Sequence, residues 1–185
     1  MPDNKKMVEI RHFKMSFGDK TVIKDLSFDV FRGEVFGFLG SNGSGKTTTL
    51  RALLGLYQPT AGDLLINGKP YSVESQIRLG YLPEERGLYK KEKVLDVMLY
   101  FGQLKGLSRK EAKDFSMKFL ERVNLSDKAN TQLDKLSGGQ QQKIQLGVTI
   151  MGNPELLIMD EPAKGFDPVN RRLLMNIIEE QRKAG

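Results

Sequence analysis

The sequence lacks cysteine altogether and contains a single histidine, His12, among its 185 residues. The absence of cysteine excludes thiol redox chemistry, a cysteine zinc cluster and a secreted scaffold held by disulfides. Because the sequence has only one histidine, a metal site built from several histidines is also excluded. No run of residues is apolar enough to span a membrane, and residues 1–6 are too polar for a secretory signal. We therefore expect a cytoplasmic globular protein.

The net charge of +6 arises from 29 basic and 23 acidic residues. A basic balance suits a nucleic acid, an anionic membrane surface or a polyphosphate ligand. Here the two signs are interleaved, and the longest local excess covers only residues 90–93. A solvated surface without a specific partner is the preferred explanation of this pattern, so the charge does not select a function.

Two kinds of strand are expected. Apolar and polar residues alternate over residues 8–13 and 26–30, which predicts half-exposed antiparallel strands. Residues 35–39 and 156–159 are apolar almost throughout, which predicts strands covered on both faces, as in a parallel sheet. Residues 63–68 predict a strand that enters an Asn-Gly turn.

Helical patterns occupy much of the remaining chain. Ser108, followed three residues later by Glu111, predicts a capping box at a helix start. Because buried strands are followed by helices, we expect an α/β domain with a helical insertion across its middle. The expected helices cover residues 46–56, 94–123 with interruptions at Gly102 and Gly106, 137–151, and 170–183.

A glycine-rich loop joins the apolar segment 35–39 to the helix that begins near Lys46. Its glycines allow backbone N–H groups to point at phosphate oxygens, and the helix start adds a positive dipole end. Lys46 would contact the terminal phosphates, and the hydroxyl of Thr47 would bind Mg²⁺. A plain glycine-rich turn is the alternative, but every position of the phosphate-binding pattern is filled. The pattern comprises Gly40, Ser41, Asn42, Gly43, Ser44, Gly45, Lys46 and Thr47.

Asp160 and Glu161 follow the apolar segment 156–159. Asp160 is therefore expected at the carboxyl end of a buried strand, where open α/β sheets bind ligands. Its carboxylate could hold Mg²⁺ opposite Thr47, and Glu161 could polarise an attacking water. Many strands end in acidic turns, so this pair is informative only together with the phosphate loop.

Residues 136–140 predict a second anion-binding helix start. Ser137 is a good N-cap, and Gly138 and Gly139 would expose their N–H groups at the first turn. An ordinary capped helix is the alternative explanation. Since one bound nucleotide seldom needs two such sites, the second site would serve the nucleotide of another molecule.

Along the chain, the three segments follow one another as residues 40–47, 136–140 and 156–161. Segments of these sequences in this order resemble the nucleotide-binding subunit of an ATP-binding-cassette (ABC) transporter. Residues 136–140 match the signature sequence of that family without a substitution, and the resemblance extends over essentially the whole chain. It implies a P-loop NTPase core, with a mostly parallel sheet and flanking helices. An N-terminal antiparallel β subdomain and an inserted helical subdomain complete this architecture. Residues 1–87 and 136–185 would form the ATP-binding core, and residues 88–135 the helical subdomain.

The resemblance also assigns roles to individual residues. Phe17 would stack on adenine, residues 80–83 would lead into the Q-loop at Glu84, and Phe166 and Asp167 would lie in the D-loop. Catalysis would involve Glu161, Lys46 and Glu84, and Mg²⁺ would be held by Thr47, Asp160 and Glu84. The expected nucleotide contacts are Phe17, Gly40, Ser41, Asn42, Gly43, Ser44, Gly45, Lys46, Thr47, Thr48, Ser137, Gly138, Gly139 and Gln140.

The family implies ATP and Mg²⁺ as cofactors and a head-to-tail dimer, here a homodimer, with two ATP molecules between the subunits. Each phosphate loop would face Ser137 and its neighbours in the other copy. Closure and hydrolysis would drive a separate transmembrane permease, which places the subunit on the cytoplasmic face of the cell membrane. No nucleic acid is expected as a partner.

Three positions depart from the family pattern. Glu84 replaces the usual Q-loop glutamine, which adds charge and removes an amide donor. Lys164 occupies a D-loop position that is usually small or hydroxylic, and Phe166 replaces a leucine. Residues 82–89 resemble those of a bacterial exporter-type subgroup. Coupling between subunits is therefore harder to anticipate than ATP binding.

The family also has a switch histidine on a strand beyond the D-loop helix, and the sequence ends at Gly185, where that strand would begin. His12 lies well before the phosphate loop and cannot replace it. We therefore expect the final strands to be missing and the isolated 185-residue chain to hydrolyse ATP poorly.

The main alternative function is an ABC ATPase that acts on nucleic acid or ribosomes without a membrane partner. Such relatives typically carry two cassettes or a long coiled-coil insertion, and neither is visible in this sequence. A non-catalytic nucleotide-binding regulator is a third possibility. The presence of Lys46, Asp160 and Glu161 together disfavours it.

Overall fold

The computed structural model describes residues 5–72, 77–85 and 87–184. The chain forms two compact units: residues 1–76 together with 179–185 make the first, and residues 77–178 make the second. Arg86, which belongs to the exporter-like segment 82–89, lies outside the described residues.

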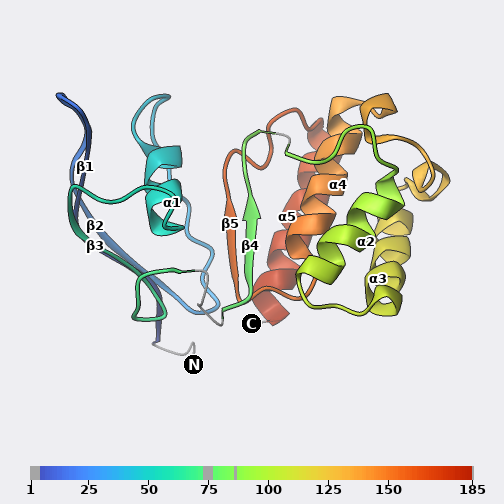
Figure 1. The fold of residues 1–185 in the computed structure, drawn as a ribbon, viewed down its shortest axis with the longest axis horizontal. Coiled ribbons are helices and arrows are strands. Elements are labelled where there is room, and N and C mark those ends of the chain that lie inside the picture. The colour runs from blue at the N-terminus through green and yellow to red at the C-terminus, as the bar shows by residue number, and fades with distance from the viewer. Residues whose placement is uncertain (1–4, 73–76, 86, 185) are drawn as a thin grey trace. The chain divides into compact units, whose positions relative to one another are not determined.

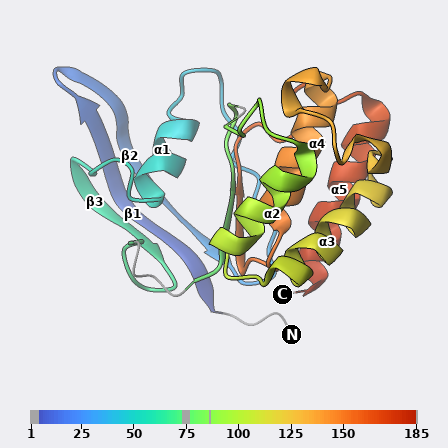
Figure 2. The ribbon, with the colours of Figure 1, turned by 45° about the vertical axis from the view of Figure 1, so that its right-hand side comes forward.

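The first unit contains a three-stranded antiparallel sheet and helix α1 (Lys46–Leu53), which lies beside the sheet (Figures 1 and 2). The strands are β1 (Lys6–Phe17), β2 (Lys20–Phe31) and β3 (Ala61–Ile66), in the order β2-β1-β3. The alternating segments 8–13 and 26–30 thus form the predicted antiparallel strands. A register shift at His12, whose φ is 46°, lets both Ile10 and Phe13 point into the core, although they are three residues apart.

The turn after β3 has the backbone that its Asn-Gly sequence predicts. Asn67 and Gly68 have φ angles of 53° and 78°, and the N–H of Ile66 donates to the carbonyl of Lys69 at 2.8 Å. Positive φ at both central positions is typical of a two-residue hairpin turn. The expected strand and turn over residues 63–68 are therefore both present, and β3 begins two residues earlier than predicted.

The predicted strand over residues 35–39 is wrong, because residues 34–41 form no regular secondary structure. Phe36 and Phe38 instead pack their rings on Phe28 of β2, with centroid distances of 4.8 and 5.6 Å. Leu39 is 91% exposed. Apolar composition favours burial, but a strand also requires a neighbouring strand for its backbone hydrogen bonds. Within the described residues, this segment pairs with none.

The second unit contains two parallel strands and a group of helices. Strands β4 (Leu79–Leu82) and β5 (Leu156–Met159) pair in register, with Leu82 opposite Met159. Strand β4 was not predicted, since its four residues include Gly80 and are too few to show a period. Gly80 has a packing role, because a Cβ there would lie 2.6 Å from the carbonyl oxygen of Thr149.

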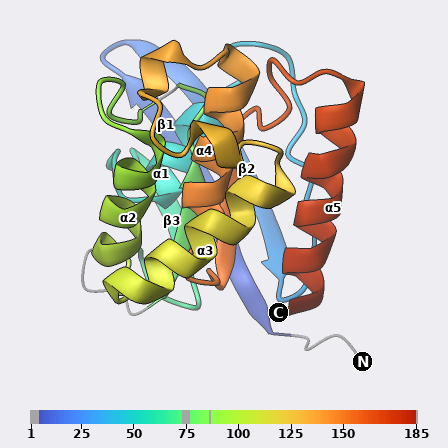
Figure 3. The same cartoon turned by 90° about the vertical axis from the view of Figure 1, so that its right-hand side faces the viewer.

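Among the described residues, three α-helices, two 3-10 turns and the part of α5 up to Ile178 complete the second unit. Helix α4 lies between α5 and the pair α2–α3 in Figure 1, and in Figure 3 it lies between α5 and α2, with α3 crossing in front of it. Gly147 of α4 leaves room for the ring of Phe119, which a Cβ would overlap. The α-helices are α2 (Val94–Leu104), α3 (Arg109–Arg122), α4 (Gly138–Ile150) and α5 (Pro168–Ala184), and the 3-10 turns are η1 (Ser126–Lys128) and η2 (Leu133–Lys135).

The predicted helices are all present, with ends displaced by no more than a few residues. Ser108 caps α3 as expected: its Oγ accepts from the N–H of Glu111 at 3.2 Å, and the Glu111 carboxylate accepts from the N–H of Ser108 at 2.8 Å. The molecule is thus α/β, with an antiparallel N-terminal sheet, a parallel strand pair and flanking helices. None of the described helices combines the length and the apolar character needed to cross a membrane.

Candidate functional site

The phosphate-binding loop leads directly into α1 in the first unit. Gly43 and Gly45 have φ angles of 79° and 95°, which side-chain-bearing residues rarely adopt. Gly45 is also crowded, because a Cβ there would lie 2.9 Å from Cγ1 of Ile23. The hydroxyl of Thr49 donates to the Gly45 carbonyl at 2.9 Å, which fastens the loop to the helix that follows it. These contacts hold the loop in a strongly curved conformation.

Lys46 folds back over this loop. Its Nζ donates to the carbonyl oxygens of Gly40 at 2.8 Å and of Ser41 at 3.1 Å. A phosphate oxygen accepts from an ammonium group more strongly than a neutral carbonyl does, so the same ammonium is suited to a phosphate. The first turn of α1 contains no acidic residue, and its amides lack intrahelical acceptors. The loop and helix start together form an environment that favours an anion.

Three further predicted nucleotide contacts also lie in the first unit. Thr47 and Thr48 are half-buried in the first turn of α1. Phe17 ends β1 and is 46% exposed, and its ring meets Tyr57 edge-on at a centroid distance of 5.4 Å. The exposed ring of Phe17 is thus available for stacking. His12 sits in β1 beside Asp25, with 3.4 Å between Nδ1 and Oδ1, as expected for a residue outside the candidate site.

In the second unit, Asp160 directly follows β5. Its N–H donates to the Leu82 carbonyl at 2.8 Å, which extends the pairing of β5 with β4 by one residue. The side chain is only 3% exposed, and within the described part of the chain its Oδ2 atom has no hydrogen-bond partner. A buried carboxylate oxygen without a partner is costly, so this atom calls for a cation or a donor from outside the chain.

Mg²⁺ fits this requirement. It is usually bound by one or two carboxylates, and water and phosphate oxygens complete its shell. Among residues 5–72, 77–85 and 87–184, no three acidic or histidine side chains gather into a group that could hold a metal by themselves. The unpartnered Oδ2 of Asp160 is therefore compatible with a Mg²⁺ ion whose other ligands include phosphate oxygens. It does not indicate a metal site made of protein ligands alone.

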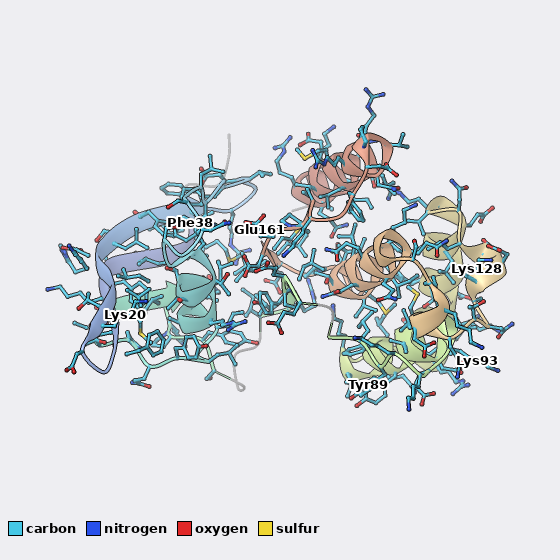
Figure 4. All side chains as sticks on the ribbon, turned by 90° about the horizontal axis from the view of Figure 1, so that it is seen from above. Lys20, Phe38, Tyr89, Lys93, Lys128 and Glu161 are labelled. Carbon is cyan, nitrogen blue, oxygen red and sulfur yellow. The ribbon has the colours of Figure 1, made fainter. Side chains whose placement is uncertain are left out.

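Glu161 is exposed on the loop after β5 and is labelled in Figure 4. Its φ of 50° lies in the left-handed region, which is uncommon for a residue with a side chain. The Glu161 carbonyl accepts from the N–H of Lys164 at 3.0 Å, so this residue begins a tight turn. The turn fixes the backbone at Glu161, immediately beyond the buried Asp160.

Glu84 lies two residues beyond β4, on a loop that α4 holds from one side. The side-chain amide of Gln145 donates to the carbonyls of Pro83 at 3.4 Å and Glu85 at 3.1 Å, one on each side of Glu84. The Glu84 carboxylate accepts from Nζ of Lys164 at 2.5 Å. Sequence reasoning missed Gln145, whose position in a predicted helix gave no signal of this role. The sequence analysis named Glu84 and Lys164 separately and did not predict that they pair. Their opposite charges are the only sequence signal of this ion pair.

The N-terminus of α4 is capped as the sequence predicts. Oγ of Ser137 accepts from the N–H of Gln140 at 3.3 Å, and Oε1 of Gln140 accepts from the N–H of Ser137 at 2.9 Å. This capping box engages the amides of Ser137 and Gln140. Between them lie the amides of Gly138 and Gly139, for which the helix offers no acceptor. This pair of amides at the helix start can bind an anion.

Two groups of predicted site residues result. The phosphate loop, Thr48 and Phe17 belong to the first unit; Glu84, Asp160, Glu161 and residues 137–140 belong to the second. Within the second unit, the start of α4 is close to the loop after Glu161, because a Cβ on Gly139 would lie 3.7 Å from the carbonyl oxygen of Gly165. The structure therefore brings the signature segment and the D-loop of the same chain together.

A phosphate loop, a buried aspartate after a parallel strand and a glycine-rich capped helix define a P-loop nucleotide-binding protein. The chain belongs to the ABC transporter family, whose sequence model matches residues 23–164. Since this match covers more than half of the chain, it also identifies the protein as an ABC-type ATP-binding chain.

Two curated relatives illustrate the similarity. An uncharacterized ABC transporter ATP-binding protein of Methanocaldococcus jannaschii is 42% identical over 98% of this chain and 66% of its own length. The linearmycin resistance ATP-binding protein LnrL of Bacillus subtilis is 34% identical over 97% of this chain and 58% of its own length. The chain thus spans only about three fifths of the length of these relatives.

A solved structure described as the ATP-binding subunit of an ABC transporter is similar throughout the fold. It superimposes with a TM-score of 0.86 at 28% identity and covers 97% of this chain and 76% of its own. The fold is therefore that of an ABC ATP-binding subunit, as the sequence predicts. ATP hydrolysis is the reaction that this family performs.

Proposed function

We propose that this chain binds ATP together with Mg²⁺ and hydrolyses it to drive transport through a separate transmembrane permease. The capped start of α4 is the observation that carries this proposal. Its amides at Gly138 and Gly139 form a second anion-binding helix start besides the one at Lys46. One nucleotide needs only one such site. The second is explained if two copies assemble head to tail as a homodimer, each contributing α4 to the ATP held by the other.

The phosphate loop is proposed to hold the nucleotide. The amides of residues 40–48 surround the phosphates, and Lys46 exchanges the carbonyls of Gly40 and Ser41 for phosphate oxygens. The exposed ring of Phe17 stacks on the adenine base. Gln140 keeps Ser137 fixed at the start of α4, where the signature segment contacts the nucleotide of the other copy.

The acidic residues are proposed to prepare the attack of water. Asp160, Thr47 and Glu84 would hold Mg²⁺, which would supply positive charge to the phosphates. Glu161 accepts a proton from the attacking water, because its side chain is exposed on the turn that follows β5. The buried Asp160 is suited to the metal and the exposed Glu161 to the water.

The helical part of the chain, residues 88–135, is proposed to contact the permease on the cytoplasmic face of the membrane. An exposed aromatic cluster supports this assignment: Tyr89, Tyr100 and Phe101 lie with ring centroids 5.5–6.1 Å apart, and Tyr89 and Tyr100 are 54% and 46% exposed. Figure 4 shows Tyr89 beside α2. Exposed aromatic side chains of this kind are typical of protein interfaces.

Export is the proposed direction of transport. The name of the LnrL relative refers to resistance against linearmycin, a role that export of a toxic compound would explain. The exporter-like segment 82–89 also supports this direction. In this proposal, ATP binding closes the dimer, and hydrolysis reopens it. The permease alternates between its two orientations as a result.

Replacement of Lys46 by alanine tests the nucleotide assignment. The variant Lys46→Ala is expected to bind ATP at least about a hundredfold more weakly, because the phosphates lose a charged donor. Binding of a fluorescent ATP analogue to the purified protein measures this change. Lys20→Ala is the matched control, since Lys20 is an exposed lysine at the start of β2 (Figure 4) and its loss should leave the affinity unaltered. Equal affinity of the Lys46→Ala variant and the parent would refute the phosphate site.

A further inference from the structure

We infer that Lys164 is a positioning residue for Glu84, so that two of the three positions at which this chain departs from the family pattern act as one charge-compensated pair. This inference rests on the proposed function, because it assigns Glu84 a role near Mg²⁺ and water. The observation behind it is the contact of 2.5 Å between Nζ of Lys164 and Oε1 of Glu84. The two residues are 80 positions apart in the sequence.

Both partners are presented by anchored loops. Gln145 holds the backbone on both sides of Glu84 through the carbonyls of Pro83 and Glu85. Lys164 belongs to the turn that Glu161 begins, and its N–H donates to the Glu161 carbonyl at 3.0 Å. The same turn is fixed by the buried side chain of Phe166. The pair therefore forms between two parts of the backbone whose positions are already set, which limits its entropic cost.

The pair is too exposed to serve mainly as a stabilising contact. The side chains of Lys164 and Glu84 are 64% and 39% exposed. Ion pairs at such exposure contribute little to the stability of a fold. Their effect on a local charge is larger, because an adjacent cation favours the ionised form of a carboxylate and fixes the direction of its oxygens.

The neighbourhood of Glu84 explains why compensation is needed. Strands β4 and β5 lie side by side and are parallel (Figure 1), so Glu84 and Asp160 both follow carboxyl ends at one edge of the strand pair. A glutamine at position 84 would leave this edge with less negative charge. Glutamate adds one negative charge to this edge, and the ammonium group of Lys164, on the loop that carries Glu161, balances that charge. Lys164 thus acts on Glu84, the proposed ligand of Mg²⁺ and water, by balancing its charge and by orienting its carboxylate.

A double-mutant cycle in the purified protein tests this inference, with Lys164→Ala, Glu84→Gln and the double variant. In the presence of Glu84, loss of Lys164 is expected to lower kcat about tenfold with little change in KM for ATP, because the carboxylate loses its orientation. With glutamine at position 84, the same loss is expected to lower kcat less than about twofold, because no charge remains to be compensated. Lys164→Arg should retain activity within about threefold of the parent.

A measurement without turnover accompanies the cycle. In the nucleotide-free protein at pH 7, the carbon-13 resonance of the Glu84 carboxyl group should shift after Lys164→Ala, because the carboxylate loses its cationic hydrogen-bond partner. An unchanged resonance, or the same loss of kcat with glutamate and with glutamine at position 84, would overturn the inference. Failure of the parent protein to bind ATP would instead overturn the proposed function, so the two failures are distinguishable.

Discussion

At the scale of single residues, the phosphate loop depends on two glycines for different reasons. Gly43 and Gly45 both have positive φ angles, but only Gly45 is surrounded by other side chains. A Cβ on Gly45 would meet Ile23 and Val22, whereas a Cβ on Gly43 would have no heavy atom within 4 Å. A side chain at position 43 would therefore cause backbone strain alone, whereas a side chain at position 45 would cause both backbone strain and steric overlap.

We expect Gly45→Ala to be more harmful than Gly43→Ala. The left-handed backbone alone costs an alanine about 1–2 kcal/mol, and this cost applies at both positions. At position 45, the overlap with Ile23 adds to it and should displace the start of α1. Urea denaturation and ATP-analogue binding, measured on both variants, provide the comparison. Similar losses of stability and affinity in the two variants would show that crowding at Gly45 has no consequence.

The sequence was most informative where one residue type has one use. The left-handed glycines of the loop and the Ser137 cap of α4 could be predicted, because each residue type has few alternatives in that local pattern. The role of Gln145 could not be predicted. A glutamine in a helix gives no local sign of its partner, and here the partner is backbone about 60 residues away. Long-range hydrogen bonds of this kind depend on the fold.

At the scale of elements, α4 is the central helix of the second unit, and both of its ends are capped by side chains. The capping box of Ser137 and Gln140 closes its N-terminus. At the other end, Nζ of Lys105 donates to the carbonyls of Val148, Thr149 and Met151 at 2.7, 2.8 and 3.1 Å. These carbonyls include acceptors that a helix leaves unsatisfied at its C-terminus, where a positive charge is favoured.

Replacement of Lys105 by methionine should destabilise the protein by about 1–2 kcal/mol at pH 7, because three carbonyls lose a common donor while the apolar stem is retained. Thermal or urea unfolding measures the difference. Lys113→Met provides the control, since Lys113 is an exposed lysine of α3. If both variants unfold with the same midpoint, the contacts of Lys105 do not stabilise α4.

The same lysine gives the stability of the protein a pH dependence. Burial lowers the pKa of Lys105 to about 8, from an ordinary value of 10.5. Between these two values, the unfolded chain carries a proton that the folded chain has released, so the contribution of this group to stability rises with pH. Below about pH 8 both states are protonated, and the cost of burying the charge is fully present. A comparison of the parent and Lys105→Met from pH 7 to 10.5 should show the rise only in the parent; parallel curves would contradict it.

Elements were predictable where a local pattern fixes them. Period and caps located α3 and α4, and the Asn-Gly pair located the turn after β3. The segment 35–39 failed because apolar composition does not reveal whether another strand is available for pairing. Strand β4 was missed for the complementary reason, since its four residues become a strand only through their pairing with β5.

At the scale of the whole molecule, the predicted site residues are distributed over two compact units. The phosphate loop and Phe17 belong to one, and the acidic residues and the signature segment belong to the other. In the proposed mechanism, the ATP held by the phosphate loop of one copy also contacts the signature segment of another copy, so ATP favours the dimer over separate copies. The oligomeric state in ATP is therefore the most direct measure of the mechanism.

Glu161→Gln is expected to accumulate as an ATP-bound dimer, because water activation fails while the phosphate loop and Asp160 are retained. We expect kcat to fall about a hundredfold or more. Light scattering after size-exclusion chromatography in ATP and Mg²⁺ should show the mass of a dimer. Added to Glu161→Gln, Lys46→Ala should abolish both binding and dimerisation.

Gly138→Asp provides the sharper control, since it places a negative charge at the signature helix start and should leave the phosphate loop of the same chain intact. The Gly138→Asp, Glu161→Gln double variant should bind ATP yet remain monomeric, because α4 can no longer accept the phosphates held by the other copy. A Glu161→Gln variant that stays monomeric in ATP and still turns over would show that Glu161 is not the base. Dimerisation that persists after Gly138→Asp would show that the contact between copies lies elsewhere.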